Sequence, residues 1–230
     1  MRDWKRFWNE YPLTLDEADF LRQVCHTIDG RPYTPSQFDT MVDAIRQGFQ
    51  LDPTSSLLDV CCGNGAVTAK LAIHCRQAVG IDFSVPLIEV ARKFHGANNT
   101  RFLELDAREL TSIDLPEAPF DKVMMYGALQ HFDVEDLDRL LSAFLRHGSA
   151  ARTILLGGVP DKARIRCLFD TPEKLSLHRT FQREGRDVIG TWWDTNAIRD
   201  ACRRFGLDCR IDNESSDRPG GHYRFDAWIS

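Results

Sequence analysis

From residue 57 onward, short runs rich in branched apolar residues alternate with stretches whose apolar residues recur at helical spacing. This alternation is typical of a parallel sheet whose strands are joined by crossover helices. Because such crossovers are right-handed, it predicts a doubly wound α/β fold that binds ligands at the carboxyl ends of its strands. Strands are expected near residues 57–61, 77–82, 101–105, 120–126, 152–158, 207–212 and 222–229, and helices near 65–75, 84–96, 134–147 and 195–205.

The first fifty residues carry a helical pattern instead. Apolar residues recur at helical spacing over Leu13–Thr27, and Thr34-Pro35 predicts the start of a second helix that continues to Phe49. Later, Pro160–Trp193 is too long for a plain connection, which indicates a lid or acceptor-binding insertion. The expected organisation is one structural domain with an N-terminal helical cap over 1–50 and a main part over 51–230, including the insertion at about 160–193.

The composition is that of an acidic globular chain. Its 230 residues contain 29 basic and 34 acidic side chains, so the formal net charge is −5, and 43% of the residues are hydrophobic. A negative chain is poorly suited to hold a phosphate backbone, so nucleic acid is not expected as a partner. The apolar runs are far shorter than the roughly 20 residues that cross a bilayer, and the first residues show no signal-peptide pattern. A cytoplasmic monomer or homodimer with no membrane partner is expected.

The chain holds seven cysteines, an odd number without CxxC spacing. This favours reduced thiols over a disulfide framework or a zinc site, and the scattered histidines do not indicate a metal. The adjacent Cys61 and Cys62 could form a redox pair, but vicinal thiols are strained when oxidised, and buried packing is the favoured interpretation. The cysteines are Cys25, Cys61, Cys62, Cys75, Cys167, Cys202 and Cys209.

The most informative stretch is Leu57–Ala72, in which an apolar strand containing Asp59 runs into a glycine turn and then a helix. Gly63 and Gly65 permit a tight turn that brings backbone N–H groups close to a ligand. Such a turn alone is a weak signal, because many folds that bind nothing contain it. A nicotinamide-binding version would also need a glycine at Thr68.

Acidic residues end three successive predicted strands, at Asp59, Asp82 and Asp106. Asp82 lies about where a ribose-binding carboxylate belongs in a nucleoside-binding α/β fold. Its alternative role is a helix cap, but Ser84 is better placed as the N-cap. The three carboxylates would line one crevice, which suits a ligand with a positive centre, ribose hydroxyls and an adenine amino group, and would repel a pyrophosphate.

The run from about Leu57 to Val159 resembles the class I S-adenosylmethionine-dependent methyltransferases. The family's acid-and-glycine motif reads Asp59-Val-Cys-Cys-Gly-Asn-Gly65, with Cys61 where the first glycine usually stands. Further motifs match over residues 80–92, 105–110 and 120–132. The resemblance implies a seven-stranded, mostly parallel Rossmann-like sheet, S-adenosyl-L-methionine as cofactor and S-adenosyl-L-homocysteine as product.

The resemblance also implies the roles of the cofactor-binding residues. Asp59 and the glycine turn would hold the methionine portion, Asp82 the ribose and Phe83 the adenine ring. Asp106 would read the adenine edge, and Tyr126 would approach the sulfonium and its methyl group. The full expected set is Asp59, Cys61, Gly63, Asn64, Gly65, Asp82, Phe83, Ser84, Asp106, Ala107, Tyr126 and Gly127. The segment Gln23–Pro32 resembles a less studied group, in which it caps the cofactor cleft.

The acceptor must be aligned with the methyl group and, if it is a hydroxyl or ammonium, must lose a proton. His131 is the candidate general base, because its ordinary pKa is near 6.5 and it follows the fourth strand. The alternative is that His131 stacks on the cofactor or caps the next helix.

The acceptor pocket is expected between the insertion, the N-terminal helices and the last strands. Because adjacent residues of an extended segment face opposite ways, at most one of Trp192 and Trp193 should meet the substrate. The candidate substrate-binding residues are Tyr11, Tyr33, Trp192, His222, Tyr223 and Arg224. Arginines make the insertion basic, which fits either an anionic acceptor or a solvated face: Arg164, Arg166, Arg179, Arg183 and Arg186.

The predicted function is transfer of a methyl group to an oxygen or nitrogen of a small molecule, with sugars and secondary-metabolite intermediates as the acceptor classes that the resemblance suggests. Two other functions stay open. One is a non-catalytic binding or scaffold protein with the same fold. The other, less favoured, is a nicotinamide-dependent oxidoreductase.

Overall fold

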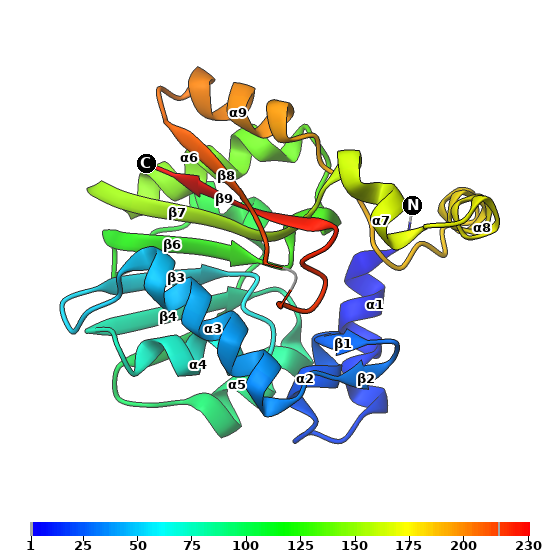
Figure 1. Cartoon of the computed structure of the whole chain (residues 1–230). Coiled ribbons are helices and arrows are strands. Elements are labelled where there is room, and N and C mark those ends of the chain that lie inside the picture. The colour runs from blue at the N-terminus through cyan, green and yellow to red at the C-terminus, as the bar shows by residue number, and fades with distance from the viewer. Residues whose placement is uncertain (1, 216) are drawn as a thin grey trace.

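The computed structural model describes residues 2–215 and 217–230 and has one seven-stranded sheet at its centre (Figure 1). The sheet order is β5-β4-β3-β6-β7-β9-β8, and the described pairs are parallel except the two that β9 forms. This confirms the doubly wound, mostly parallel fold. The strands are β3 (Ser56–Val60), β4 (Gln77–Asp82), β5 (Thr100–Glu104), β6 (Phe120–Tyr126), β7 (Gly148–Pro160), β8 (Cys209–Asn213) and β9 (Arg224–Ile229).

Helices cover both faces of the sheet because the strands are apolar on both faces. In β3, Leu57 packs into a core cluster with residues of α3 and α4, whereas Leu58 packs into the cluster that contains residues of α6 and α9. Figure 1 shows α3 crossing the front of the sheet, with α6 behind it. The helices that flank the sheet are α3 (Pro35–Phe49), α4 (Ala66–Ala72), α5 (Val85–His95), α6 (Asp136–His147) and α9 (Thr195–Arg204).

The predicted start of α3 is confirmed in detail. Thr34 accepts a hydrogen bond from the Gln37 backbone N–H, and the Gln37 side chain accepts one from the Thr34 backbone N–H. This reciprocal capping box, with Pro35 in the first turn, satisfies backbone donors that a helix start leaves unpaired. The helix ends at Gln50, whose backbone is left-handed.

The predicted helix over Leu13–Thr27 is wrong. The segment is broken into a 3-10 turn at Pro12–Thr14, a single turn of helix α2 at Phe20–Gln23, and strand β1 at Thr27–Ile28, which pairs with β2 at Arg31–Pro32. Leu13 is 72% exposed, so the apolar spacing did not mark a buried helix face. Cys25 has a φ of 54°, which no right-handed helix contains.

A further helix, α1 (Trp4–Glu10), precedes this segment and was not predicted. Asp3 caps it by accepting a hydrogen bond from the Arg6 backbone N–H. In Figure 1, the arrowhead of β6 marks the end of the strand, and α1 lies past that end of the sheet. The cap therefore lies at the carboxyl ends of the parallel strands, where ligands of such folds bind.

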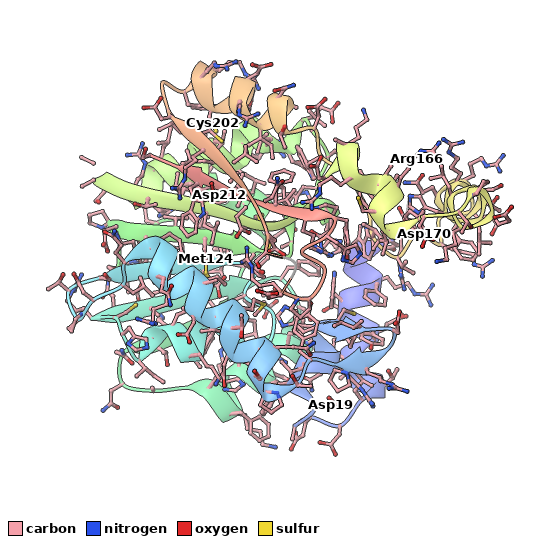
Figure 2. All side chains as sticks on the ribbon, viewed as in Figure 1. Asp19, Met124, Arg166, Asp170, Cys202 and Asp212 are labelled. Atoms are coloured by element: carbon pink, nitrogen blue, oxygen red, sulfur yellow. The ribbon has the colours of Figure 1, made fainter. Side chains whose placement is uncertain are left out.

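The insertion after β7 projects from the body of the molecule (Figure 1) and consists of a 3-10 turn at Lys162–Arg164, α7 (Ile165–Leu168) and α8 (Pro172–Arg183). Figure 2 shows Arg166 and Asp170 out on this projection, far from Met124 in the sheet. The backbone N–H of Trp193 donates to Pro160, which closes the base of the insertion. Within the described residues, no helix is long and apolar enough to cross a membrane.

Candidate active site

A cavity of about 370 Å³ opens where the carboxyl ends of β3, β4 and β6 face α1. This volume falls in the range of roughly 300–1,000 Å³ that is usual for small-molecule sites. Nine of the predicted site residues line it: Asp59, Cys61, Gly63, Asn64, Asp82, Phe83, Tyr126, Gly127 and His131. The N-terminal cap adds Arg2, Trp4, Lys5, Trp8, Val24 and His26.

The turn between β3 and α4 has an unusual backbone. Gly63 and Gly65 have φ values of 57° and 78°, and Cys61, without being glycine, has a φ of 63°. A Cβ atom on Gly63 would lie 2.7 Å from Cγ1 of Val24 in the N-terminal cap. The first position of the glycine motif therefore keeps a glycine-like conformation although it is a cysteine.

Asp59 lies in β3, just before this turn, and is 2% exposed. The Thr68 hydroxyl donates to its Oδ2 at 2.5 Å, and Asp59 lines the cavity. Burial raises the pKa of Asp59 to about 7, against the lowering effect of the Thr68 hydrogen bond. A bound ammonium group would stabilise the ionised form of this carboxylate.

Asp82 accepts two backbone hydrogen bonds, from Gly63 N–H at 2.9 Å and from Ser84 N–H at 2.9 Å. It thereby ties the glycine turn to the end of β4. Burial raises its pKa to about 6, although both hydrogen bonds favour ionisation. Ser84 does occupy the N-cap position of α5, but its hydroxyl donates to the Trp8 carbonyl instead of capping the helix.

Four members of the predicted cofactor set do not line the cavity. Gly65 packs against Phe102, where an added Cβ would lie 2.6 Å from the ring. Ser84 is fully buried beneath α1, while Asp106 and Ala107 begin the 3-10 helix after β5. Contacts of all twelve residues with the cofactor stay predictions.

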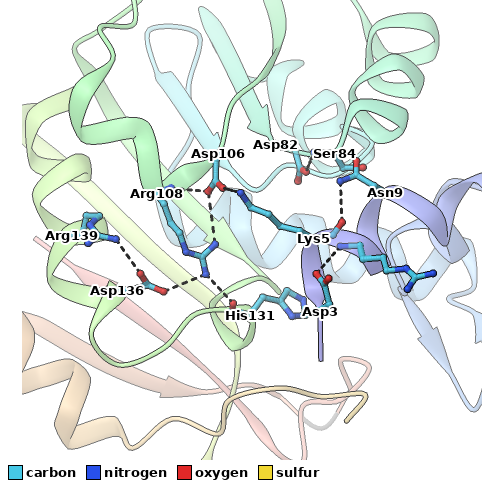
Figure 3. Close-up of polar contacts among 11 residues, drawn as sticks. Asp3, Lys5, Asn9, Asp82, Ser84, Asp106, Arg108, His131, Asp136 and Arg139 are labelled. Carbon is cyan, nitrogen blue, oxygen red and sulfur yellow. Dashed lines mark hydrogen bonds and ion pairs between the residues drawn. The ribbon is translucent and has the colours of Figure 1, made fainter. Parts of the chain in front are cut away.

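Asp106 is held by a cation from the N-terminal cap (Figure 3). Lys5 Nζ lies 2.6 Å from its Oδ2, and the backbone N–H of Arg108 donates to Oδ1 at 3.0 Å. Burial opposes ionisation, but Lys5 and Arg108 outweigh it and keep the pKa of Asp106 below its ordinary value. Arg108 also donates to the His131 carbonyl at 3.4 Å, so one network joins the ends of β5 and β6 to α1.

His131 lies against two tryptophans of α1. Its ring centroid is 4.2 Å from that of Trp4 and 5.5 Å from that of Trp8. Nδ1 is buried and has no hydrogen-bond partner among the described residues. Burial and the nearby charge of Arg224 lower the pKa of His131 to about 3, so the imidazole is neutral at pH 7 and is a weak base.

His26 is a cavity-lining residue that the sequence interpretation missed as a site residue. Its ring stacks on Tyr33 with centroids 5.3 Å apart and planes 4° apart. Burial lowers the pKa of His26 to about 4. The available signal was its position inside Gln23–Pro32, the segment whose resemblance predicts a cap over the cofactor cleft.

Asn64 is also tied to the cap. Its side-chain amide donates to the Phe20 carbonyl and to the Gln23 side chain, each at 2.8 Å. Gln23 is 1% exposed, so this contact is part of the core between the cap and the glycine turn. The side chain of Asn64 therefore joins two parts of the protein in addition to lining the cavity.

The six predicted substrate-binding residues do not line this cavity in the part of the chain that the structure describes. Tyr11 stacks on Phe7, and His222 is exposed. Tyr223 lies between Trp192 and Arg224, at 5.7 Å from the Trp192 ring and 4.9 Å from the guanidinium carbon. Tyr33, as described above, stacks on His26.

A second cavity of about 430 Å³ adjoins the first and shares Arg2 and Trp4 with it. Lys162 and Trp192 line its far side. Trp193 is 1% exposed, as expected if one member of the tryptophan pair is core. The arginines of the insertion line neither cavity, and four of them are exposed: Arg166, Arg179, Arg183 and Arg186.

Residues 57–149 match the family described as a methyltransferase domain. The O-methyltransferase cnsE of Penicillium expansum is 31% identical over 178 residues, which cover 69% of this chain and 62% of that protein. An uncharacterized RNA methyltransferase of Chlorobaculum tepidum is 30% identical over 89 residues, 37% of this chain and 18% of that one. The chain thus spans less than two thirds of the length of both relatives.

Among solved structures, magnesium protoporphyrin IX methyltransferase from Synechocystis PCC 6803 with bound S-adenosylhomocysteine superposes with a TM-score of 0.65. The two chains are 16% identical, and the superposition covers 98% of this chain and 96% of that one. At this identity the likeness concerns the fold. The family match, the motifs from Asp59 to His131 and the strand order together identify the chain as a member of the class I S-adenosylmethionine-dependent methyltransferases.

Proposed function

We propose that the protein uses S-adenosyl-L-methionine to methylate an oxygen or nitrogen of a small molecule. The observation that carries the proposal is one cavity that brings together the glycine turn and the buried carboxylates Asp59 and Asp82. A scaffold protein with no ligand would gain nothing from two buried carboxylates whose ionisation burial opposes.

The residues fit the proposed cofactor part by part. The glycine turn and Asp59 suit the ammonium end, Asp82 suits the ribose hydroxyls, and Phe83 offers a ring face for adenine. Tyr126 and Gly127, at the end of β6, suit the sulfonium. When bound, the cofactor would supply the activated methyl group, and the protein would align the acceptor and exclude water.

The second cavity is the proposed acceptor pocket. It adjoins the cofactor cavity through Arg2 and Trp4, so an acceptor there would lie against Trp4, whose ring also contacts His131. Trp4 and Trp192 provide aromatic walls that suit a ring, and the oxygen specificity printed in the name of the cnsE relative supports a hydroxyl acceptor. His131 lines the cofactor cavity on the other side of Trp4, so a hydroxyl that extends past Trp4 into that cavity would donate a hydrogen bond to the neutral imidazole.

RNA is the less favoured acceptor, although one relative carries an RNA methyltransferase name. That match covers 18% of the relative, and this chain has a net charge of −5. A protein that holds RNA gains much of its affinity from cationic side chains on phosphates. A small acceptor in an aromatic pocket agrees better with the charge of the chain.

Calorimetric titration of the full chain with S-adenosylhomocysteine, with NAD as a parallel ligand, tests the cofactor assignment. Micromolar one-to-one binding of S-adenosylhomocysteine and no binding of NAD is the expected result. Tight NAD binding would favour an oxidoreductase. No binding of either ligand to folded protein would favour a non-catalytic scaffold.

A further inference from the structure

A buried group of charged residues lies behind Tyr126, outside both cavities. Glu214 follows β8, Arg218 lies in the connection to β9, and Arg224 and Asp226 belong to β9. The Tyr126 hydroxyl donates to Glu214 Oε1 at 2.9 Å, which links this group to a residue that lines the cofactor cavity.

The position of the Tyr126 ring is determined by two glycines of β7. A Cβ on Gly157 would lie 2.4 Å from Cδ2 of Tyr126, and one on Gly158 would lie 3.4 Å from Cε1. The Gly158 carbonyl accepts a hydrogen bond from Arg224, and its N–H donates to Asp226 at 2.9 Å. The ring is therefore packed against backbone on one side and hydrogen-bonded to Glu214 at its tip.

Glu214 is 4% exposed, and its Oε2 has no hydrogen-bond partner among the described residues. Arg218 Nη1 lies 3.7 Å from Oε1, and Arg218 Nη2 donates to Asp226 at 2.8 Å. The groups that face Glu214 are Tyr126 on β6, Arg224 and Asp226 on β9, Arg218 in the connection and Tyr33 in the cap.

Charge balance in this group depends on Glu214. When both carboxylates are ionised they balance the two guanidinium groups. When Glu214 is protonated, one positive charge is left uncompensated beside the cavity. Arg224 acts on cavity-lining side chains, since its charge contributes to the lowered pKa values of His26 and His131. A cationic ligand would be repelled by such an excess.

We propose that ionised Glu214, acting through Tyr126, makes the cavity bind S-adenosylmethionine in preference to S-adenosylhomocysteine. The inference rests on the proposed function, because the two ligands differ by the methyl group and the positive charge of the sulfonium. The ring face of Tyr126 attracts a cation, and a carboxylate that accepts from its hydroxyl strengthens that attraction. Glu214 is thus a positioning residue that sets which form of the cofactor is held.

The direction of the pH dependence follows from the same group. Burial and the charge of Asp226 raise the pKa of Glu214 to about 7, against Arg218 and Arg224. Because a cation favours the ionised carboxylate, affinity for S-adenosylmethionine relative to S-adenosylhomocysteine rises from pH 6 to pH 8. Asp59 and Asp82 titrate nearby, but they face parts that both ligands share, so their effects cancel in the ratio.

The test is calorimetry of the full chain with each ligand at pH 6 and pH 8. In the unaltered protein, the ratio of the two affinities should rise about fivefold between these pH values, a coupling at the low end of the usual range. Glu214→Gln should lower the ratio at pH 8 about five- to tenfold, abolish its pH dependence and change S-adenosylhomocysteine affinity less than twofold. Tyr126→Phe should lower it in the same direction.

The control is Glu89→Gln, which removes a carboxylate from the exposed face of α5 and should leave the ratio unchanged. A ratio that does not depend on pH, or that Glu214→Gln leaves unchanged, overturns the inference while S-adenosylhomocysteine binding still supports the proposed function. If Glu214→Gln fails to fold, the pH series of the unaltered protein and Tyr126→Phe decide. Failure of the unaltered protein to bind either ligand would instead refute the proposed function.

Discussion

The two sides of the candidate site are built differently. On the cofactor side, Asp59 and Asp82 lie near the ends of two paired strands within one stretch of chain, and the Gly63 N–H of the turn donates to Asp82. On the acceptor side, α1 and the insertion come from segments far apart in the sequence and meet around Trp4 and Trp192. The first side has a geometry that strand pairing imposes, whereas the second depends on packing between distant segments.

The largest effect is expected on the cofactor side. Asp82→Ala should weaken S-adenosylhomocysteine binding at least about 100-fold, because it removes the proposed ribose ligand and the acceptor of the Gly63 and Ser84 N–H groups. Calorimetry measures the loss. Asp121→Ala is the matched control, because Asp121 also accepts from a backbone N–H, that of Ser56, at the opposite end of the sheet. Equal losses in both variants would show that the effect is one of folding.

A second change tests where the two sides meet. Gly63→Ala should lower the free energy of unfolding by about 1–2 kcal/mol and weaken S-adenosylhomocysteine binding about tenfold, because its φ is 57° and Val24 is too close. Adding Val24→Ala should recover part of the stability, since the clash is removed and the backbone strain stays. Denaturant unfolding and calorimetry give both quantities. No recovery would mean that the cap does not press on the turn.

The ionisation of His131 distinguishes a base from a packing residue. Because burial and Arg224 lower its pKa to about 3, its imidazole should stay neutral down to pH 5 in the folded protein. NMR of the ring protons checks this, with exposed His222 as an internal comparison. A midpoint for His131 between pH 6 and 7 would support the general-base hypothesis. Near pH 5, His131 binds a proton in the unfolded chain but not in the folded protein. The free energy of unfolding therefore falls as pH is lowered from about 6.5 toward the folded-state pKa of about 3.

The smallest effect is expected at the contact between α1 and Asp106. Lys5→Gln should change S-adenosylhomocysteine affinity by no more than about fivefold, because Lys5 is 62% exposed and such ion pairs are weak. If the adenine amino group donates to Asp106, Lys5 competes with it for that carboxylate. Removing the Lys5 charge should then raise the affinity for S-adenosylhomocysteine and make that affinity depend less on salt concentration. Calorimetry at two salt concentrations measures this, with Arg6→Gln on the exposed side of α1 as the control. A fall in affinity would mean that Lys5 itself supports the ligand.

Local patterns predicted most of the cofactor side. Acidic and glycine residues at strand ends predicted the glycine turn and the sheet, and both are observed. They did not reveal that the Ser84 hydroxyl binds the Trp8 carbonyl or that Lys5 holds Asp106, since both partners lie in α1. The acceptor residues were predicted from chemical type alone, and none of those six lines the cofactor cavity within the described chain.

From residue 57 onward, the sequence by itself determined the order of the sheet's strands and the helices between them, because the pattern of apolar residues follows directly from burial of each element. It also predicted a tight turn at Gly63 and Gly65, whereas the left-handed backbone of Cys61 was seen only in the structure. Only the tertiary structure decided what surrounds that turn. The segment predicted as a helix over Leu13–Thr27 is not continuous, and Cys25 within it has a left-handed backbone. Helix α1 packs beside His131 through Trp4. Contacts between distant segments depend on shape and packing, which no local period in the sequence records.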